Sequence, residues 1–368
     1  MNDKTLHVGA PNIGDRELFH KYVDEIFDRR WLTNRGRLVQ DFERELADYL
    51  GVKHCITMCN GTIALEIAIR ALNLRGEVIV PSMTFIATAH ALQWQEIKPV
   101  FCDIDPETYC IDPIEVERHI TPNTTGILAV HLYGRPCDIE RLQSIADKHD
   151  LNLLFDAAHA FGCSHQGQMI GNFGDCEVFS FHATKFFNTF EGGCIATNDD
   201  ALAKKIRLMQ NFGFQGMDNV GYIGTNGKMT EVAAAMGLTN LKSLPDFMEI
   251  NKSNYNTYKT YISRIRGLKL MEFEDSETCN WQYLVLEVKS DYPLTRDELL
   301  NKLHSSNVLA RRYFWPGCHN MEPYRSYQPN AKLLLRHTEE VAARILTLPT
   351  GTAVSRDDID RVCNILKS

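Results

Sequence analysis

The sequence contains no apolar run that approaches the ~20 residues needed to cross a bilayer. Its first residues, MNDKTLHVGAPNIGD, lack the apolar core of a secretory signal peptide. No CxxC pair and no HxxxH or HExxH pattern occurs, so the 11 cysteines and 13 histidines predict no metal site. An odd number of scattered cysteines, several of them in apolar runs, favours buried free thiols over disulfides. We therefore expect a cytoplasmic protein.

The charge balance excludes another class of partner. A net charge of -8 argues against a surface that binds nucleic acid or anionic membranes non-specifically, although it leaves room for a local phosphate pocket. Hydrophobic residues make up 44% of the 368 residues, as in a soluble globular protein with a sizeable core. This length fits a large domain and a smaller one.

Short β-rich runs alternate with helical patterns between about residues 52 and 199. Runs such as ILAVHL and LNLLF are apolar on both faces, as strands of a parallel sheet covered by helices must be. The pattern predicts an α/β/α sandwich with ligands at the carboxyl ends of the strands. The expected strands are His54–Cys59, Glu77–Val80, Val100–Ile104, Gly126–His131, Leu151–Phe155, Val178–Phe181 and Gly193–Thr197.

The character of the sequence changes after about Pro245. A long helical pattern over Asp246–Ile265 leads into one strand, Trp281–Val288, and two further helices, Arg296–His304 and Ser355–Leu366. We therefore predict a large α/β/α domain with a mostly parallel sheet over residues 1–245 and a smaller α+β domain over residues 246–368.

Three motifs follow expected strands. In CNGTIALEIAIRAL, Gly61 and Thr62 open a helix whose free N–H groups suit a phosphate, although a plain helix cap by Asn60 has the same pattern. In LNLLFDAAHAFG, a buried strand delivers Asp156, followed by His159. A carboxylate there needs a cation, which is either a structural ion-pair partner or the protonated ring nitrogen of a cofactor.

The third motif is VFSFHATKFFNTFEGGCIATND, in which Lys185 follows Ser180. Most lysines are solvated surface residues, but Lys185 has Phe181, Phe186, Phe187 and Phe190 as sequence neighbours. Desolvation by such neighbours lowers the pKa of a lysine and supplies the neutral amine that Schiff-base chemistry needs. Together the motifs predict an enzyme that uses pyridoxal 5'-phosphate (PLP).

The chain resembles the DegT/DnrJ/StrS-type sugar aminotransferases, which are PLP enzymes of fold type I. DAAHAFG and SFHATKFFNTFEGG carry the resemblance best, and WLTNRGRLVQDFE, GTNGKMTEVAAAMGL and RRYFWPGCH extend it over nearly the whole chain. The subset with DAAHAFG and SFHATK resembles transaminases that aminate C4 of a nucleotide-linked 4-keto-6-deoxyhexose, such as those that make dTDP-4-amino-4,6-dideoxyglucose.

The resemblance implies roles for individual residues. Lys185 forms the Schiff base and moves protons, and Asp156 pairs with the pyridine nitrogen. Asn226 reaches the phosphate from the partner subunit of a homodimer, and glutamate is the amino donor. The implied cofactor-binding residues also include Gly61, Thr62, Phe85, His159 and Ser180, and the implied substrate-binding residues are Trp31, Thr33, Asn34, His182, Arg311, Arg312, Tyr313 and His319.

Alternatives stay open at this point. Many members carry glutamine at the position of His159, and the two adjacent arginines are as typical of a solvated surface as of a diphosphate site. Rival functions are amination at C3, PLP-dependent sugar dehydration and a non-catalytic PLP-binding regulator. Relatives that dehydrate replace the lysine with histidine, whereas Lys185 is present here.

Overall fold

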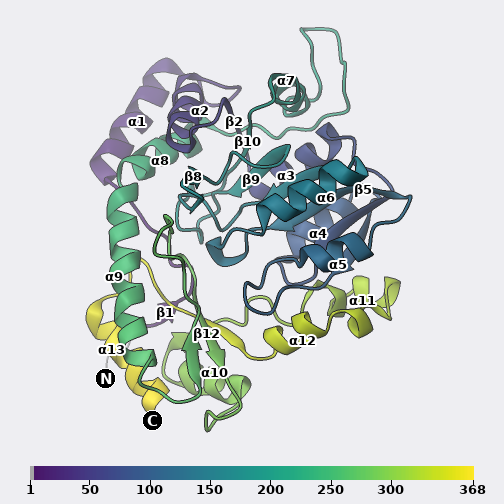
Figure 1. Ribbon diagram of the computed structural model, residues 1–368. Helices are drawn as coiled ribbons and strands as arrows, with labels where there is room; N and C mark the ends of the chain where they lie inside the picture. The colour runs from purple at the N-terminus through teal and green to yellow at the C-terminus, as the bar shows by residue number, and fades with distance from the viewer. Residues whose placement is uncertain (1–3) are drawn as a thin grey trace.

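The computed structural model describes residues 4–368, and its centre is a seven-stranded sheet (Figure 1). The seven strands expected from the apolar runs are all present, and their ends differ from expectation by at most two residues. In spatial order they are β2 (His54–Met58), β10 (Gly193–Thr197), β9 (Cys176–Ser180), β6 (Asn152–Asp156), β5 (Thr124–Val130), β3 (Glu77–Pro81) and β4 (Lys98–Cys102).

Neighbouring strands run parallel except around β10, which is antiparallel to both β2 and β9. Successive strand residues enter two different cores, for example Leu153 one core and Leu154 the other, so the sheet is buried on both faces. The prediction of an α/β/α sandwich with a mostly parallel sheet is therefore confirmed.

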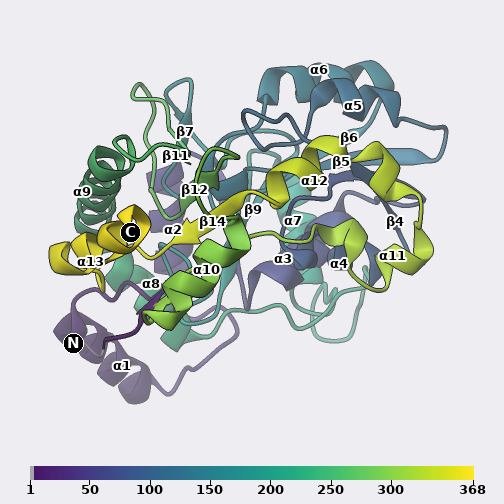
Figure 2. The same ribbon diagram turned by 90° about the horizontal axis from the view of Figure 1, so that it is seen from below.

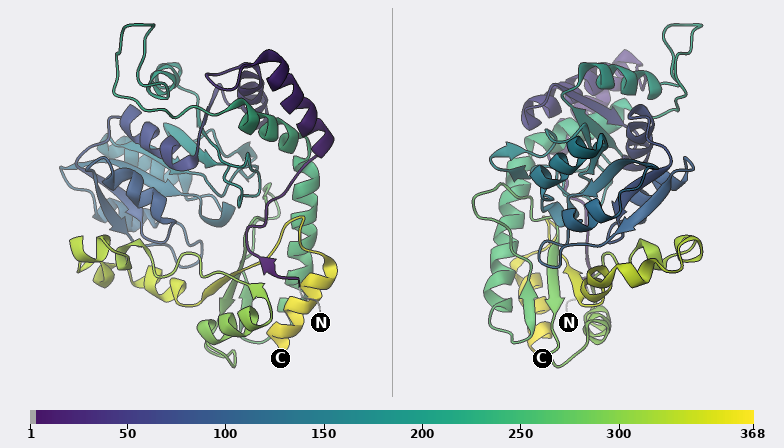
Figure 3. Two further views of the ribbon diagram at one scale, coloured as in Figure 1. Left: turned by 180° about the vertical axis from the view of Figure 1, so that it is seen from behind. Right: turned by 45° about the vertical axis from the view of Figure 1, so that its right-hand side comes forward.

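Helices cover the two faces of this sheet (Figures 1 and 3). Apolar residues of α3 (Gly61–Ala71), α4 (Ile86–Gln93) and α7 (Asp200–Met209) pack against one face. Those of α2 (Arg37–Leu50), α5 (Pro113–Arg118), α6 (Ile139–His149) and α8 (Glu231–Lys242) pack against the other. Helix α1 (Arg16–Arg29) lies along α8.

A second, smaller sheet has the order β11 (Leu268–Leu270), β12 (Leu284–Val288), β14 (Ile345–Leu348) and is antiparallel throughout. It shares a core with α9 (Leu244–Ile262), α10 (Arg296–Ser305) and α13 (Arg356–Lys367) (Figure 2). Capping boxes at Thr295 with Glu298 and at Ser355 with Asp358 start α10 and α13.

Two segments connect the large sheet region and the smaller one. Strand β1 (Leu6–His7) pairs with β13 (Val308–Leu309) and buries Leu6 in the smaller core, so both ends of the described chain lie near α13 (Figures 1 and 3). The shorter elements around Cys318 and Tyr324 pack instead with α3 and α4. These shorter elements are η2 (Cys318–Asn320), α11 (Tyr324–Tyr327), η3 (Ala331–Leu334) and α12 (Arg336–Ala342). A domain boundary at residues 245 and 246 stays a prediction.

The remaining elements belong to the large sheet region. They are η1 (Leu132–Gly134) and the hairpin of β7 (Ser164–His165) and β8 (Gln168–Met169).

Within residues 4–368, none of the helices combines the length and the apolar character needed to cross a membrane.

Candidate active site

The carboxyl ends of three parallel strands form one side of a cavity of about 600 Å³. Val130 of β5, Asp156 of β6 and Val178 of β9 are register partners, and all three line this cavity. Parallel strands bring such end residues together at one edge of a sheet, where α/β proteins bind ligands. The cavity also contains Gly61, Thr62, Phe85, His159, Ser180, His182, Lys185 and Tyr313, so it unites most of the residues expected from the sequence.

Lys185 lies in a short loop that follows β9, with its N–H bonded to the carbonyl oxygen of His182 at 2.8 Å. Burial lowers the pKa of Lys185 to about 8, although the negative charge of Asp156 acts in the opposite direction. The direction is the one expected from the sequence, but the four phenylalanines are not among the residues that line the cavity. Three of them are buried in the core beneath the loop, and Phe190 is 47% exposed.

The carboxylate of Asp156 is held from two sides. Thr88 donates its hydroxyl to Oδ2 at 2.8 Å, and the N–H of Ala158 donates to Oδ1 at 3.1 Å. Burial raises the pKa of Asp156, whereas these hydrogen bonds and the charge of Lys185 lower it. No ion pair of Asp156 is formed within the described chain, and a buried acid of this kind matches the need for a partner on a bound ligand.

The turn into α3 forms a narrow cradle against β9. The side chain of Asn60 accepts the N–H of Ile63 at 2.8 Å, so Asn60 caps the helix, and the N–H groups of Gly61 and Thr62 lie at its first turn. A Cβ atom on Gly61 would lie 2.9 Å from Cβ of Ser180. The cradle therefore places the Ser180 hydroxyl beside a helix N-terminus, which suits an anion such as phosphate.

His159 is buried, and its ring stacks on Phe314 with centroids 5.7 Å apart and an interplanar angle of 6°. Its Nδ1 accepts the N–H of Tyr133 at 3.2 Å. Burial holds the pKa of His159 well below its usual value, and Lys185 lowers it further. The imidazole is therefore neutral and carries its proton on Nε2.

An aromatic wall lies on one side of the cavity and consists of Phe85, Tyr283, Tyr313 and Phe314. Phe85 precedes α4, is 55% exposed and lies 6.2 Å from Phe314 between ring centroids. Tyr313 and Phe314 are stacked with centroids 5.0 Å apart. Such a wall offers flat apolar contact to a ring in the cavity.

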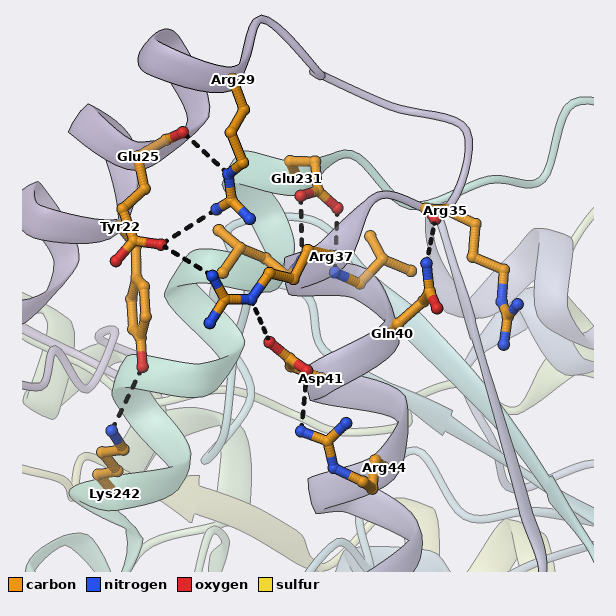
Figure 4. A network of polar contacts seen from close by, with 12 residues as sticks. Tyr22, Glu25, Arg29, Arg35, Arg37, Gln40, Asp41, Arg44, Glu231 and Lys242 are labelled. Carbon is orange, nitrogen blue, oxygen red and sulfur yellow. Dashed lines mark hydrogen bonds and ion pairs between the residues drawn. The ribbon is translucent and has the colours of Figure 1, made fainter.

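The loop between α1 and α2, residues 30–36, contains Trp31, Thr33 and Asn34 and contributes nothing to the cavity lining. Glu231 holds its far end, because its two carboxylate oxygens each accept a backbone N–H from the first turn of α2 at 3.0 Å (Figure 4). Trp31 is 55% exposed. The structure does not bring these residues together with Lys185 in one subunit. The ion pairs that alternate beside the loop are Arg29–Glu25, Arg37–Glu25, Arg37–Asp41 and Arg44–Asp41 (Figure 4).

Asn226 also lies outside the cavity lining. It belongs to the long segment between α7 and α8, part of which projects from the body of the molecule (Figures 1 and 3). Backbone bridges of Asn226 with Asn211 and of Phe214 with Val220 shape this segment. Its tip exposes apolar side chains: Met217 is 94% and Ile223 is 74% exposed.

The residues of the RRYFWPGCH block differ in whether they line the cavity. Tyr313 lines the cavity, but Arg311 and Arg312 do not. Arg312 pairs with Asp297 at 3.1 Å. His319 is only 2% exposed, and both ring nitrogens are engaged, Nδ1 with Ser82 at 2.6 Å and Nε2 with Glu339 at 2.7 Å. His319 therefore connects the block to the end of β3. Its ring is buried and both nitrogens are occupied, so it offers no free polar atom for the contact with substrate that the sequence predicted.

Sequence reasoning missed several residues of the site. Thr84 and Thr88 follow β3, and their hydroxyls, 2.9 Å apart, lead to Asp156. The rule that ligands meet the carboxyl ends of strands would have pointed to Thr84, whereas no local signal marks Tyr283. Glu191 lines the cavity as well, and its position directly before Gly192–Gly193 was the available signal. Residues 4–368 contain no cluster of three side chains suited to hold a metal.

PLP is an aromatic aldehyde with a phosphate and a basic ring nitrogen, and the cavity offers a complement to each group. Lys185 supplies an amine of lowered pKa, Asp156 a buried carboxylate, and the Gly61–Ser180 cradle an anion site that a Cβ would fill. Fold and cavity together fit an enzyme that uses PLP.

The comparisons identify the group within this class. Residues 14–367 match the model of the DegT/DnrJ/EryC1/StrS aminotransferase family, and the chain belongs to that family. A crystal structure of DesI in the presence of its TDP-sugar product is 46% identical, covers 99% of this chain and 93% of its own, and superimposes with a TM-score of 0.95. The resemblance, the fold class and the cofactor expected from the sequence are thereby confirmed.

Curated relatives cover nearly the whole chain. The dTDP-4-amino-4,6-dideoxy-D-glucose transaminase of Shigella dysenteriae is 38% identical over 99% of both chains. The GDP-perosamine synthase of Caulobacter vibrioides is 36% identical over 97% of this chain and 96% of its own. A dTDP-3-amino-3,6-dideoxy-alpha-D-galactopyranose transaminase of Aneurinibacillus thermoaerophilus is 31% identical over 92% of each.

Proposed function

We propose that this enzyme transfers the amino group of glutamate to C4 of a dTDP-linked 4-keto-6-deoxyhexose, in the biosynthesis of an amino sugar. The observation that carries the chemistry is that Lys185, Asp156 and the Gly61–Ser180 cradle share one cavity. The choice of C4 and of dTDP is supported by the similarity to the Shigella dysenteriae transaminase and to DesI, whose structure contains a TDP-sugar product.

Lys185 is proposed as the residue that binds the cofactor and moves the proton. Bound PLP supplies an electron sink for reaction at the carbon that carries the amino group. Because its pKa is about 8, the Nζ of Lys185 accepts and returns a proton near neutral pH far more readily than a surface lysine. Asp156, oriented by Thr88 and the N–H of Ala158, keeps a proton on the ring nitrogen of the cofactor.

The remaining cavity residues are proposed to hold the cofactor in place. The first N–H groups of α3, at Gly61 and Thr62, and the Ser180 hydroxyl bind the phosphate, as an anion at a helix N-terminus. His159 donates its Nε2 proton to the phenolic oxygen of the ring, since its Nδ1 is already an acceptor. Phe85 covers the ring.

A homodimer with shared active sites belongs to the proposal. Asn226 and the loop with Trp31 contribute nothing to the cavity of their own subunit. The projecting segment that contains Asn226 exposes Met217 and Ile223, and exposed apolar side chains of this size are typical of protein contacts. We therefore propose that Asn226 acts in the cavity of the partner subunit.

Other functions have less support. Amination at C3 is the nearest rival, because a relative named for a 3-amino sugar covers 92% of this chain. Dehydration and a non-catalytic regulator role are disfavoured by the cavity, which retains Lys185 together with Asp156.

A product analysis tests the proposal. The purified enzyme, PLP and glutamate are incubated with dTDP-, UDP- and GDP-linked 4-keto sugars and with a dTDP-linked 3-keto sugar, and the products are analysed by mass spectrometry and NMR. The expected product has nitrogen on C4 of the dTDP-linked sugar and appears with one equivalent of 2-oxoglutarate. Nitrogen on C3, or consumption of a sugar without glutamate, would refute the proposal.

A further inference from the structure

Glu191 is an acid at the cavity that has no role in the proposed chemistry. Of the cavity-lining residues in the described chain, only Asp156 and Glu191 carry a carboxylate, and none is an arginine. The side chain of Glu191 is 64% exposed, so it borders the open mouth of the cavity, whereas Asp156 lies at the buried end. Glu191 is therefore available to a substrate that enters beside Lys185.

The backbone around Glu191 holds it at this point. Its carbonyl oxygen accepts the hydroxyl of Thr189 at 2.9 Å, and Phe190 has a left-handed φ of 64°. A Cβ atom on Gly192 would lie 2.0 Å from Oγ1 of Thr189, and one on Gly193 would lie 2.8 Å from the backbone of Asn60 and Gly61. Gly193 thus allows the segment to approach the phosphate cradle, and Gly192 allows the tight turn against Thr189 that precedes it. The left-handed φ of Phe190 is maintained by this surrounding structure.

His182 lies next to Glu191 and has a defined orientation. Its Nδ1 accepts the N–H of Thr184 at 3.2 Å and lies 2.8 Å from the Thr184 hydroxyl, so a neutral ring carries its proton on Nε2. That nitrogen lies 3.5 Å from a carboxylate oxygen of Glu191. The side chains of His182 and Glu191 are 45% and 64% exposed, and a pair this open and this long adds little to folding. Its arrangement therefore needs another explanation.

We propose that Glu191 and His182 together bind the sugar hydroxyl that flanks the reacting carbon. This inference rests on the proposed function: in a 4-keto-6-deoxyhexose, C4 has neighbours C3, which carries a hydroxyl, and C5, which carries none. The C3 hydroxyl donates to the carboxylate of Glu191 and accepts the Nε2 proton of His182. A hydroxyl offers one donor and two lone pairs, and the pair supplies one partner of each kind.

The amino donor does not use this pair. Glutamate has no hydroxyl that could donate to the carboxylate of Glu191 and accept from His182. Glu191 and His182 are therefore specific to the sugar half of the reaction. A change at Glu191 is expected to weaken sugar binding and to leave the rate of the glutamate half-reaction within about 2-fold.

The contact between the C3 hydroxyl and the pair Glu191 and His182 is measured by binding the sugar to a form of the enzyme that cannot react. PLP-loaded enzyme without glutamate has no amino group to transfer, so calorimetry gives the dissociation constants of dTDP-4-keto-6-deoxyglucose and of its 3-deoxy analogue. We expect the wild-type enzyme to bind the 3-deoxy sugar about 10-fold or more weakly, because the analogue can form neither of the two hydrogen bonds, one of them to a charged carboxylate. In Glu191→Ala the two sugars are expected to bind within about 2-fold of each other, and Glu191→Gln, which keeps the size of the side chain, is expected to fall between. Glu66→Gln is the matched control, since Glu66 lies on α3 but outside the cavity lining, and should keep the wild-type ratio.

For each variant, the absorbance change of bound PLP on reaction with glutamate alone, measured in a single turnover, verifies that the enzyme is folded and loaded with cofactor. A wild-type enzyme that binds both sugars equally, or a Glu191→Ala enzyme that keeps the wild-type ratio, would overturn the inference. Failure of the proposed function is seen separately, as nitrogen on C3 in the wild-type product, because the binding ratios are measured without turnover.

Discussion

Lys185 should destabilise the folded apoenzyme at neutral pH, and replacing it with methionine tests this consequence of its burial. The folded protein lowers the pKa of Lys185 from 10.5 to about 8, a difference of about 2.5 units. At about 1.4 kcal/mol per unit, holding the protonated amine in the cavity costs about 3 kcal/mol relative to the unfolded chain. Lys185→Met removes that charge, and the Met side chain keeps a similar length.

The sign of the effect defines a pH window. Below pH 8 the lysine is protonated in both the folded and the unfolded state, so the full penalty applies and the variant is more stable by up to about 3 kcal/mol. As the pH rises from about 8 to 10.5, the folded-state amine loses its proton first and the advantage of the variant disappears. Asp156 loses its nearby cation in the variant, which makes the actual gain smaller than this limit.

Urea unfolding of apoenzyme at pH 7, 8, 9 and 10 measures the difference between variant and wild type, and other groups that titrate in this range cancel in the difference. Lys204→Met, on the exposed face of α7, is the control and should show no such pH dependence. A Lys185→Met apoenzyme that is less stable than wild type at pH 7, or a difference that stays constant up to pH 10, would refute the assignment of a buried amine.

Three further substitutions test separate parts of the site. Lys185→Ala should fold normally but incorporate no label when PLP-treated enzyme is reduced with borohydride, and label on the wild-type enzyme at any other residue would contradict the mechanism. Asp156→Asn should retain cofactor while kcat falls by about 100-fold or more, because the ring nitrogen loses its proton; kcat within a few-fold of wild type would count against that role. Gly61→Ala places a Cβ 2.9 Å from Cβ of Ser180 and should raise the dissociation constant for PLP, measured by absorbance titration, by about 10-fold or more. Unchanged affinity would mean that the phosphate binds elsewhere.

The strands of the large sheet were predictable because each is a largely apolar run that ends in a polar or small residue or directly before one. Their spatial order was not, since strand pairing depends on contacts between distant segments. Strand β10 is the clearest example: its run is as apolar as the others, yet it lies antiparallel between β2 and β9. Strands β11 and β14 were also missed, because short runs of three and four residues carry little periodicity.

The candidate site was predictable to a similar degree. Lys185 and Asp156 follow apolar strands and bear unusual neighbours in the sequence, so local reasoning found them. Burial lowers the pKa of Lys185 as expected, but Phe181, Phe186 and Phe187 lie in the core, Phe190 is 47% exposed, and only the lysine lines the cavity. That these phenylalanines cause the low pKa stays a prediction. His319 illustrates what the sequence could not show: its ring nitrogens contact Ser82 and Glu339, so it connects two segments of the chain, and its contact with substrate stays a prediction.

The position of β10 is what makes one site out of two motifs that lie over 100 residues apart. Gly193 pairs with Met58 of β2 on one side and with Ser180 of β9 on the other, so the start of β10 joins the end of the first motif to the end of the strand that precedes Lys185. The contact is close enough that a Cβ on Gly193 would strike Asn60 and Gly61, and a Cβ on Gly61 would strike Ser180. The glycines at these two positions are therefore required by the approach of three strands rather than by local turns. Because β10 runs antiparallel to β9, its start, with Glu191 just before it, lies at the edge of the sheet where β9 ends. The strand geometry that assembles the phosphate cradle therefore also positions the carboxylate that we assign to sugar binding.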